Sequence, residues 1–254
     1  MSKLAELFSK KSKQYKHIYD ESSSNKLLHQ EKRVRLAIVE QIIKDRLISS
    51  NENSIIDIGC GTGNLLMNLK KRDVKAKMLG IDISSKMIDL ANENLKNSNH
   101  KDLVFTKGAI EDLSIKADVV VSLGVSGYQK NQEKFLQQLT NHVEKHGILV
   151  FTTGNGDSLT RFIRLHLSRL HSKAKGMIKR NGVEFQTIKE SKVHSILSEN
   201  GFELEEKIYI TFGLGLGSSY LECFLDRFFL RNFSKNFLSK YFSLTVIYLF
   251  REAK

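Results

Sequence analysis

The sequence predicts an α/β fold built on a doubly wound parallel sheet, because short apolar strands alternate with amphipathic helices. The first strand candidates are β-branched or apolar runs, SIIDIG at 54–59, KMLGID at 77–82 and LVFTKG at 103–108. Four more follow, ADVVVSL at 117–123, GILVFTTG at 147–154, FELEEKIYITF at 202–212 and FSLTVIYLF at 242–250. Strand and helix alternating at this spacing favour parallel strands joined by crossover helices.

The helices are predicted from apolar residues that recur every three or four positions. Two come before the first strand, an irregular one at 4–20 and a clearly amphipathic one at 26–48. Within the alternating region we expect helices at 64–72, 84–98, 131–146 and 189–200. We expect Ser84 to cap the second of these, and the glycine at 147 to end the third. The alternation is interrupted only over residues 155–183.

Charge and composition narrow the class of protein. The 254 residues carry a net charge of +12, which favours anionic partners such as phosphates, nucleic acid or acidic membrane surfaces. The two cysteines form no CxxC pair, so a disulfide framework or zinc knuckle is not expected. The N-terminus lacks the apolar core of an export signal, and no stretch of 18 apolar residues predicts a transmembrane helix. We therefore expect a cytoplasmic protein, with peripheral contact to a membrane left open.

The stretch DIGCGTGNLL, residues 57–66, is typical of a cofactor-binding loop. It follows the first predicted strand, and ligands of open parallel sheets bind beyond the carboxyl ends of strands. Gly59, Gly61 and Gly63 let the backbone turn sharply and leave room for a ligand against the main chain. The helix that follows points unpaired N–H groups at the same space. Asp57 lies beside the loop as an acceptor, and Cys60 within it is interpreted as a small space-filling residue.

Asp82 ends the second predicted strand, about 20 residues beyond the loop, where an acidic side chain can accept hydrogen bonds from a ribose diol. The rival cofactor is NAD(P). Its fingerprint needs a third glycine at position 64, where this chain has Asn64. Asn64 therefore breaks the dinucleotide pattern and counts against NAD(P).

These motifs resemble the class I S-adenosylmethionine-dependent methyltransferases. The resemblance rests on DIGCGTGNL, GIDIS with Met87 following, GAIEDL and DVVVSLGVSGY, and it is clearest over residues 8–153. It implies a Rossmann-like methyltransferase fold of seven strands with one antiparallel edge strand and an N-terminal helical lid. It also implies a single domain, 1–254, with a helical cap at 1–50, a cofactor-binding core at 51–153 and an acceptor-side insertion with the last strands at 154–254.

The resemblance assigns S-adenosylmethionine as the cofactor and gives individual residues roles in binding it. The glycine loop would pack against the methionine part and Asp82 would hold the ribose. Around the adenine and the sulfonium it places Ile83, Met87, Ala109, Ile110, Glu111 and Leu123. Tyr15 would belong to the lid and Arg33 would face the methionine carboxylate. Relatives often have aspartate where this chain has Ala109, so backbone contacts would replace that side chain.

Catalytic residues are less clearly indicated. Methyl transfer from a sulfonium depends mainly on alignment, and a general base is needed only for a weakly nucleophilic acceptor. Tyr128 and Ser126 follow the fourth predicted strand; Tyr128 is the catalytic candidate, with a pocket-wall aromatic as its alternative interpretation. His142 and His146 stand one helical turn apart in the predicted helix, but a third ligand is missing, so no metal site is expected.

The acceptor is expected to be a small molecule, or one linked to a lipid, isoprenoid or glycan. Residues 161–180 contain seven Lys or Arg, no acid and interleaved apolar residues, and residues 219–242 are rich in Phe and Leu. Such segments suit an anionic membrane surface or a phosphorylated acceptor. Two alternatives stay open, an RNA-directed methyltransferase that uses 161–180 and a non-catalytic binding module. The glycine run GLGLGS at 213–218 is interpreted as a structural turn.

Overall fold

The computed structural model describes residues 3–18, 27–47, 53–96, 100–163, 185–212, 228, 231 and 234–253. The helices are α1 (Lys3–Ile18), α2 (Leu27–Arg46), α3 (Asn64–Lys71), α4 (Ser85–Lys96), α5 (Gln132–Thr140), α7 (Glu190–Glu199) and α9 (Ser239–Phe242). Short 3-10 turns lie at Ile110–Asp112 (η1) and Ser126–Tyr128 (η2). The strands are β1 (Ser54–Ile58), β2 (Lys77–Asp82), β3 (Leu103–Lys107), β4 (Ala117–Ser122), β5 (Val143–Gly154), β6 (Phe202–Ile210) and β7 (Thr245–Glu252).

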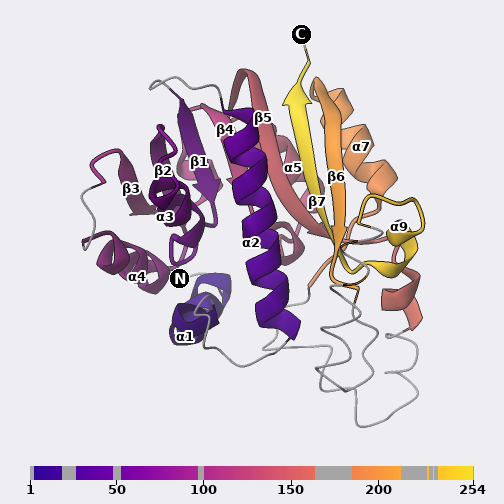
Figure 1. Ribbon diagram of the computed structural model, residues 1–254, viewed down its shortest axis with the longest axis horizontal. Coiled ribbons are helices and arrows are strands. Elements are labelled where there is room, and N and C mark those ends of the chain that lie inside the picture. The colour runs from indigo at the N-terminus through magenta and orange to yellow at the C-terminus, as the bar shows by residue number, and fades with distance from the viewer. Residues whose placement is uncertain are drawn as a thin grey trace.

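Seven strands form one sheet in the order β3-β2-β1-β4-β5-β7-β6, which confirms the predicted fold class (Figure 1). Strands β3, β2, β1, β4 and β5 are parallel to one another. Strand β7 runs antiparallel to both of its neighbours, β5 and β6. Strand β6 forms the edge of the sheet. The order reverses between β1 and β4, the switch point where this class of sheet binds ligands.

Helices cover both faces of the sheet, and each face has its own apolar cluster. Helices α2, α3 and α4 pack on one face, where Val39, Leu66 and Ala91 are fully buried. Helices α5 and α7 pack on the other, with Leu136 and Val193 fully buried (Figure 1). Successive residues of β4 alternate between the two clusters, as the two-residue period of a strand requires. Since both faces are covered, the strands read as continuous apolar runs.

The predicted helix at 131–146 is wrong in its second half. Helix α5 ends at Thr140, and β5 already begins at Val143. The pairing of β4 with β5 shifts register between Ala117 and Val119, so residues 144–147 form a bulge before the regular ladder. His146 accordingly has a positive φ of 66°. Because the stretch NHVEKH is polar, the sequence did not indicate that the strand begins at Val143. His142 and His146 therefore do not share a helix face.

Candidate functional site

The glycine loop between β1 and α3 has glycine at three positions where its backbone conformation favours glycine. Gly59, Gly61 and Gly63 all have left-handed φ values, 79°, 56° and 79°. A Cβ on Gly59 would lie 2.3 Å from Val125, and one on Gly63 would lie 2.5 Å from the Phe105 ring. A Cβ on Gly61 would meet nothing within 4 Å. The middle of the loop therefore offers bare main chain to open space, as a close-fitting cofactor needs.

Asp82 holds the loop in place from the end of β2. One oxygen of its carboxylate accepts a hydrogen bond from the Gly61 N–H at 3.0 Å, and the other accepts from the Ser84 N–H at 2.8 Å. Burial raises the pKa of Asp82, and these two hydrogen bonds oppose the rise. Each carboxylate oxygen keeps a further lone pair, so Asp82 can accept hydrogen bonds from a diol while it holds the loop.

Asp57 is the second acid of the site and lies at the end of β1. It is 3% exposed, and burial together with the nearby charge of Asp82 raises its pKa to about 7. The Arg35 guanidinium of α2 acts in the opposite direction. The same guanidinium lies 3.0 Å from the position that a Cβ on Gly124 would take, after β4. A cation from α2 thus reaches the gap between the ends of β1 and β4.

Sequence reasoning named Arg33 for the cationic role and did not name Arg35. Arg35 lies beside Asp57 and Gly124 at this edge of the sheet, and the role of Arg33 stays a prediction. Helical periodicity indicates which side of α2 each arginine occupies. Arg35 lies four residues before the fully buried Val39, whereas Arg33 lies four residues before the exposed Ala37.

The residues predicted around the adenine lie at the ends of β2 and β3. Ile83 is half-buried directly after β2, and Met87 is 1% exposed on the inner side of α4. The turn that holds Ala109 is joined to β2, since the Gly108 N–H donates to the Asp82 carbonyl at 3.1 Å. Ala109 donates its own N–H to Asp112. The fold therefore places this turn beside Asp82.

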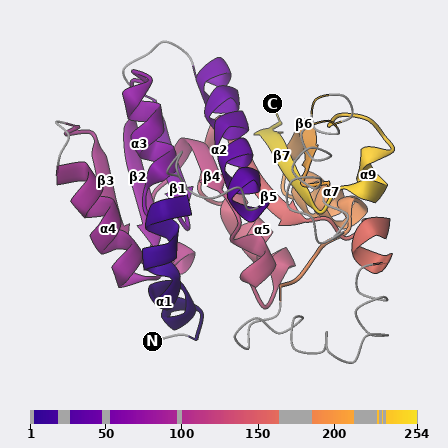
Figure 2. The same cartoon turned by 60° about the horizontal axis from the view of Figure 1, so that its bottom comes forward.

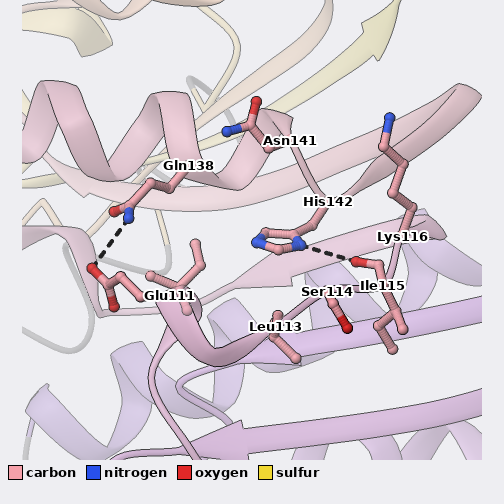
Figure 3. Close-up of a pocket in the computed structure, with 9 residues that line it drawn as sticks. Glu111, Leu113, Ser114, Ile115, Lys116, Gln138, Asn141 and His142 are labelled. Carbon is pink, nitrogen blue, oxygen red and sulfur yellow. Dashed lines mark hydrogen bonds between the residues drawn. The ribbon is translucent and has the colours of Figure 1, made fainter.

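Ile110 and Glu111 also line a pocket of about 350 Å³ between η1 and the end of α5 (Figure 3). Glu111 accepts a hydrogen bond from Gln138 at 3.1 Å, and His142 Nδ1 lies 2.9 Å from the Ile115 carbonyl oxygen. Ile115 lies two residues before β4 and His142 directly precedes β5, so this pocket extends toward the amino ends of those strands. It is separate from the glycine loop, which follows the carboxyl end of β1.

Helix α1 lies across the carboxyl ends of the strands, beside α4 (Figures 1 and 2). Its Ser9 hydroxyl lies 3.0 Å from the Ser84 hydroxyl at the start of α4. Its Phe8 ring meets the Tyr128 ring edge to face at 5.2 Å. The predicted lid thus spans from the Asp82 side of the site to the turn after β4. Tyr15 belongs to this helix, and its side chain lies outside the described residues.

Tyr128 stands between two other rings. Besides Phe8 it contacts Phe185 edge to face at 5.3 Å. The Phe185 ring covers two glycines, because a Cβ on Gly127 would lie 2.3 Å from it and one on Gly154 would lie 2.7 Å away. These glycines follow β4 and end β5. Phe8, Tyr128 and Phe185 therefore form an aromatic wall over the carboxyl ends of β4 and β5.

The segment that carries Phe185 is attached to the sheet by its backbone. The Gln186 N–H donates to the Gly127 carbonyl at 2.7 Å, and the Ile188 N–H donates to that of Gly154 at 3.2 Å. The Arg161 guanidinium lies over the Phe185 ring, 5.7 Å from its centre. Phe185 and Arg161 were not singled out from the sequence, since only the fold brings the two ends of the interrupted region together.

The other predicted residues have structural partners. Leu123 is half-buried against the apolar cluster under α2. Ser126 is buried, and its hydroxyl accepts from Gln132 at 3.3 Å, which makes it a poor base. Burial and the charges of the two nearby acids raise the pKa of the Cys60 thiol, in keeping with a space-filling role.

Several sequence expectations concern residues beyond those described. They are the basic stretch from 164 to 180, the glycine run at 213–218 and most of 219–233. In the described part of the chain, no three His, Cys, Asp or Glu side chains gather as a metal site would require. Within the same ranges, no helix is long and apolar enough to cross a membrane.

Comparison with known proteins agrees with this geometry. A family model described as a methyltransferase domain matches residues 49–201, more than half of the chain. A malonyl-[acyl-carrier protein] O-methyltransferase of Halalkalibacterium halodurans is 29% identical over 66% of this chain and 62% of its own length. The chain thus spans about three fifths of that relative. A ubiquinone biosynthesis O-methyltransferase of Rickettsia bellii is 25% identical over 71% of this chain and 74% of its own.

Among solved structures, the chain is similar to a magnesium protoporphyrin IX methyltransferase from Synechocystis PCC 6803 with bound S-adenosylhomocysteine. The TM-score is 0.68, with 17% identity, over 94% of this chain and 93% of the other. At this identity the likeness concerns the fold.

Proposed function

The chain belongs to the methyltransferase domain family. From that premise we propose that it is an S-adenosylmethionine-dependent methyltransferase, and that its acceptor is a small or lipid-linked molecule held against the aromatic wall of Phe8, Tyr128 and Phe185. The observation that carries this proposal is the Phe185 ring lying over Gly127 and Gly154. Acceptors of open sheets lie beyond the carboxyl ends of the strands, where this wall stands.

For the cofactor, we propose the roles that the predicted positions suggest. The main chain around Gly61 receives the methionine part and Asp82 the ribose hydroxyls. Arg35 faces the methionine carboxylate in place of Arg33, because it already reaches the gap beside Gly124. Ile83, Met87 and the turn at 109–111 border the adenine, and Leu123 lies near the sulfonium. We also propose the division into a helical cap at 1–50, a core at 51–153 and an acceptor side at 154–254.

S-adenosylmethionine held by the glycine loop and Asp82 would supply a methyl group on a sulfonium for transfer to an acceptor lone pair, with the neutral thioether as the leaving group. The residues of this chain then act mainly by alignment and by excluding water. Helix α1 closes over the strand ends, and its Phe8 ring completes the wall. Tyr128 is held edge-on between two rings, which suits a wall more than a base. A carboxylate acceptor needs no base, whereas a hydroxyl acceptor would need one.

An apolar or aromatic acceptor body fits this wall better than a highly charged polymer does. The names of the O-methyltransferases similar to this chain include a malonyl carrier-protein enzyme and a ubiquinone biosynthesis enzyme, which supports a small or carrier-linked acceptor. The RNA alternative depends on the segment 164–180, beyond the described residues, and no described contact favours it.

Methyl transfer into cell extracts tests the proposal. The protein and S-adenosylmethionine carrying a labelled methyl group are incubated with metabolite, lipid and RNA fractions, and products heavier by one CH₂ are identified. We expect the label in the metabolite or lipid fraction. Phe185→Ala should lower this transfer at least ~10-fold, the loss of roughly one well-placed aromatic contact, and should leave S-adenosylhomocysteine binding unchanged.

The matched control is Val104→Ala, which removes another exposed apolar side chain, on β3 away from the wall. Label recovered only in RNA would refute the proposed acceptor class. Equal turnover by Phe185→Ala and the parent protein would refute the role of the wall.

A further inference from the structure

The turn that follows β4, residues 123–128, lies between the glycine loop and the aromatic wall, and we call it the β4 turn. On one side its Val125 packs against the glycine loop, because a Cβ on Gly59 would lie 2.3 Å from Val125 Cγ2. On the other side its Tyr128 forms part of the aromatic wall. The position of the β4 turn therefore sets how the glycine loop and the wall face each other.

Thr152 holds the first half of the β4 turn from the end of the neighbouring strand. Its hydroxyl oxygen accepts a hydrogen bond from the Gly124 N–H at 2.7 Å. Ile148 and Val150 of β5 belong to the apolar cluster under α2, so the two-residue period of the strand puts the Thr152 side chain on the same face. Thr152 is 2% exposed, and burial of a hydroxyl is unfavourable unless it is hydrogen-bonded. The contact with Gly124 accounts for this buried hydroxyl.

The Gly124 N–H depends in turn on the acceptor that Thr152 supplies. Gly124 has a left-handed φ of 72°, which ends β4 and begins the turn. The Arg35 guanidinium lies 3.0 Å from the position that a Cβ on Gly124 would take, so that side of the residue is occupied. A backbone N–H that loses its acceptor away from water raises the free energy. Loss of the Thr152 hydroxyl therefore favours a shifted turn.

The two ends of the β4 turn have anchors of their own. Just before the turn, the Ser122 hydroxyl donates to the Ile58 carbonyl at the end of β1, at 3.0 Å. In its second half, the buried Gln132 amide donates to the Ser126 carbonyl at 3.1 Å and to the Ser126 hydroxyl at 3.3 Å. Thr152 supplies the anchor between them. Removing its hydroxyl should displace the middle of the turn without unfolding it.

We propose that Thr152 is a positioning residue for methyl transfer. It acts through the Gly124 N–H, which keeps Val125 against the glycine loop and the aromatic wall at a fixed distance from that loop. In-line transfer tolerates little misalignment, and a displacement of about 1 Å can lower a rate by on the order of 100-fold. The inference rests on the proposed function, since it concerns the alignment of the proposed cofactor with the proposed acceptor.

Thr152→Val tests this inference, because valine keeps the shape of threonine and removes the hydrogen-bonding oxygen. We expect transfer of labelled methyl groups to the fraction of cell extract that accepts them to fall by on the order of 10-fold or more. Affinity for S-adenosylhomocysteine should stay unchanged, because the hydrogen bond between Gly61 and Asp82 is not altered. Thr152→Ser keeps the hydroxyl and should restore transfer to near the parent level.

Thr140→Val is the matched control. The Thr140 hydroxyl donates to the Gln137 carbonyl at 2.7 Å, and the residue is 7% exposed, so the same substitution removes a similarly buried hydrogen bond. Thr140 lies at the opposite end of α5 from Gln132 and therefore away from the β4 turn. This variant should lose stability as Thr152→Val does, but it should transfer methyl groups like the parent.

The Gly124 amide gives a readout that does not need turnover. In protein made with isotope-labelled glycine, its proton resonance should move upfield in Thr152→Val, because hydrogen-bonded amide protons resonate further downfield. The resonance should stay near the parent position in Thr152→Ser and in Thr140→Val.

Parent-like transfer by Thr152→Val in an active protein overturns the inference and leaves the proposed function standing. The same holds for an equal loss of transfer in Thr140→Val, for a failure of Thr152→Ser to restore transfer, and for an unchanged Gly124 resonance in Thr152→Val. A loss of S-adenosylhomocysteine affinity large enough to account for the loss of transfer also overturns it. Absence of transfer by the parent protein instead refutes the proposed function, and the inference with it.

Discussion

The carboxylate of Asp82 accepts a hydrogen bond from the Gly61 N–H at 3.0 Å, which ties the end of β2 to the middle of the glycine loop. The same carboxylate holds the Ser84 N–H at the start of α4. One side chain therefore positions the two backbone segments that a nucleoside would lie between. Asp82, about 20 residues after the loop in sequence, therefore fixes the architecture of the loop itself.

Replacing Asp82 by alanine should weaken cofactor binding. We expect the affinity for S-adenosylhomocysteine to fall by about 1.5–3 kcal/mol, the range for hydrogen bonds to a charged group. Titration calorimetry measures this directly. The control is Asp89→Ala, an exposed acid on α4, which should bind like the parent protein. Equal affinities for Asp82→Ala and the parent would remove Asp82 from the proposed cofactor site.

The buried Asp57 predicts a pH dependence of stability. Its pKa is about 7 in the folded protein, above its ordinary value of 3.8, because burial and the charge of Asp82 disfavour the carboxylate. The folded state keeps a proton that the unfolded state has lost, so this residue's contribution to stability falls as pH rises between about 4 and about 7. The expected slope approaches about 1.4 kcal/mol per pH unit inside that window.

Asp57→Asn isolates this contribution, because asparagine does not titrate. The melting temperature of the variant minus that of the parent should rise with pH through the window and level off above it. Thermal unfolding of both proteins over a pH series measures the difference. A difference that stays constant with pH would show that Asp57 is ionised throughout.

The sheet, the glycine loop and the position of Asp82 could be predicted from the sequence, because they depend on local patterns. Strand periodicity and three glycines two apart specify a conformation without reference to distant residues. The limits of α5 and β5 could not be predicted in this way. The bulge at 144–147 depends on pairing with Ala117 and Val119, which lie in another strand.

The aromatic wall was harder to predict for the same reason. Tyr128 was identified, but its partners Phe8 and Phe185 lie 120 residues before and 57 residues after it in the chain. Nothing near Phe185 in the sequence indicates that it lies over Gly127 and Gly154. For Arg35, helical spacing indicates the face of α2 on which it lies. The spacing does not indicate that its side chain reaches Asp57 and Gly124.

The polar cluster around Glu190 predicts a second effect on stability. Glu190, at the start of α7, accepts a hydrogen bond from Tyr209 at 2.8 Å and is paired with Lys207. Burial raises the pKa of Glu190, but the hydrogen bonds and the positive charges of Lys207 and Lys240 outweigh this and lower it. We expect Glu190→Gln to lower the free energy of unfolding by roughly 1–3 kcal/mol at neutral pH.

Because the pKa of Glu190 is lowered, its contribution is present above its ordinary value of 4.5 and is lost as pH falls through the folded value. The difference between variant and parent should therefore shrink in acid, which denaturant unfolding at two pH values measures. Glu133→Gln is the matched control, since Glu133 pairs with Lys192 while 53% exposed and should cost less than about 1 kcal/mol. Equal effects of the two substitutions would contradict the prediction.

Gly127→Ala should lower methyl transfer and stability without changing cofactor affinity. The added Cβ would lie 2.3 Å from the Phe185 ring, so the ring must leave the ends of β4 and β5. We expect lower methyl transfer and an unfolding free energy reduced by about 1–3 kcal/mol, the usual cost of overpacking. Affinity for S-adenosylhomocysteine should stay unchanged, because the glycine loop and Asp82 lie apart from this contact.

The double variant Gly127→Ala/Phe185→Ala separates the clash from other effects of the new methyl group. With the ring removed, the alanine at position 127 has room, so its cost to stability should largely disappear relative to Phe185→Ala alone. Denaturant unfolding of the four proteins gives the coupling energy between the two positions. A coupling near zero would show that Phe185 does not rest on Gly127 in solution. Transfer activity should stay low in the double variant, because the clash is relieved but the wall is not restored.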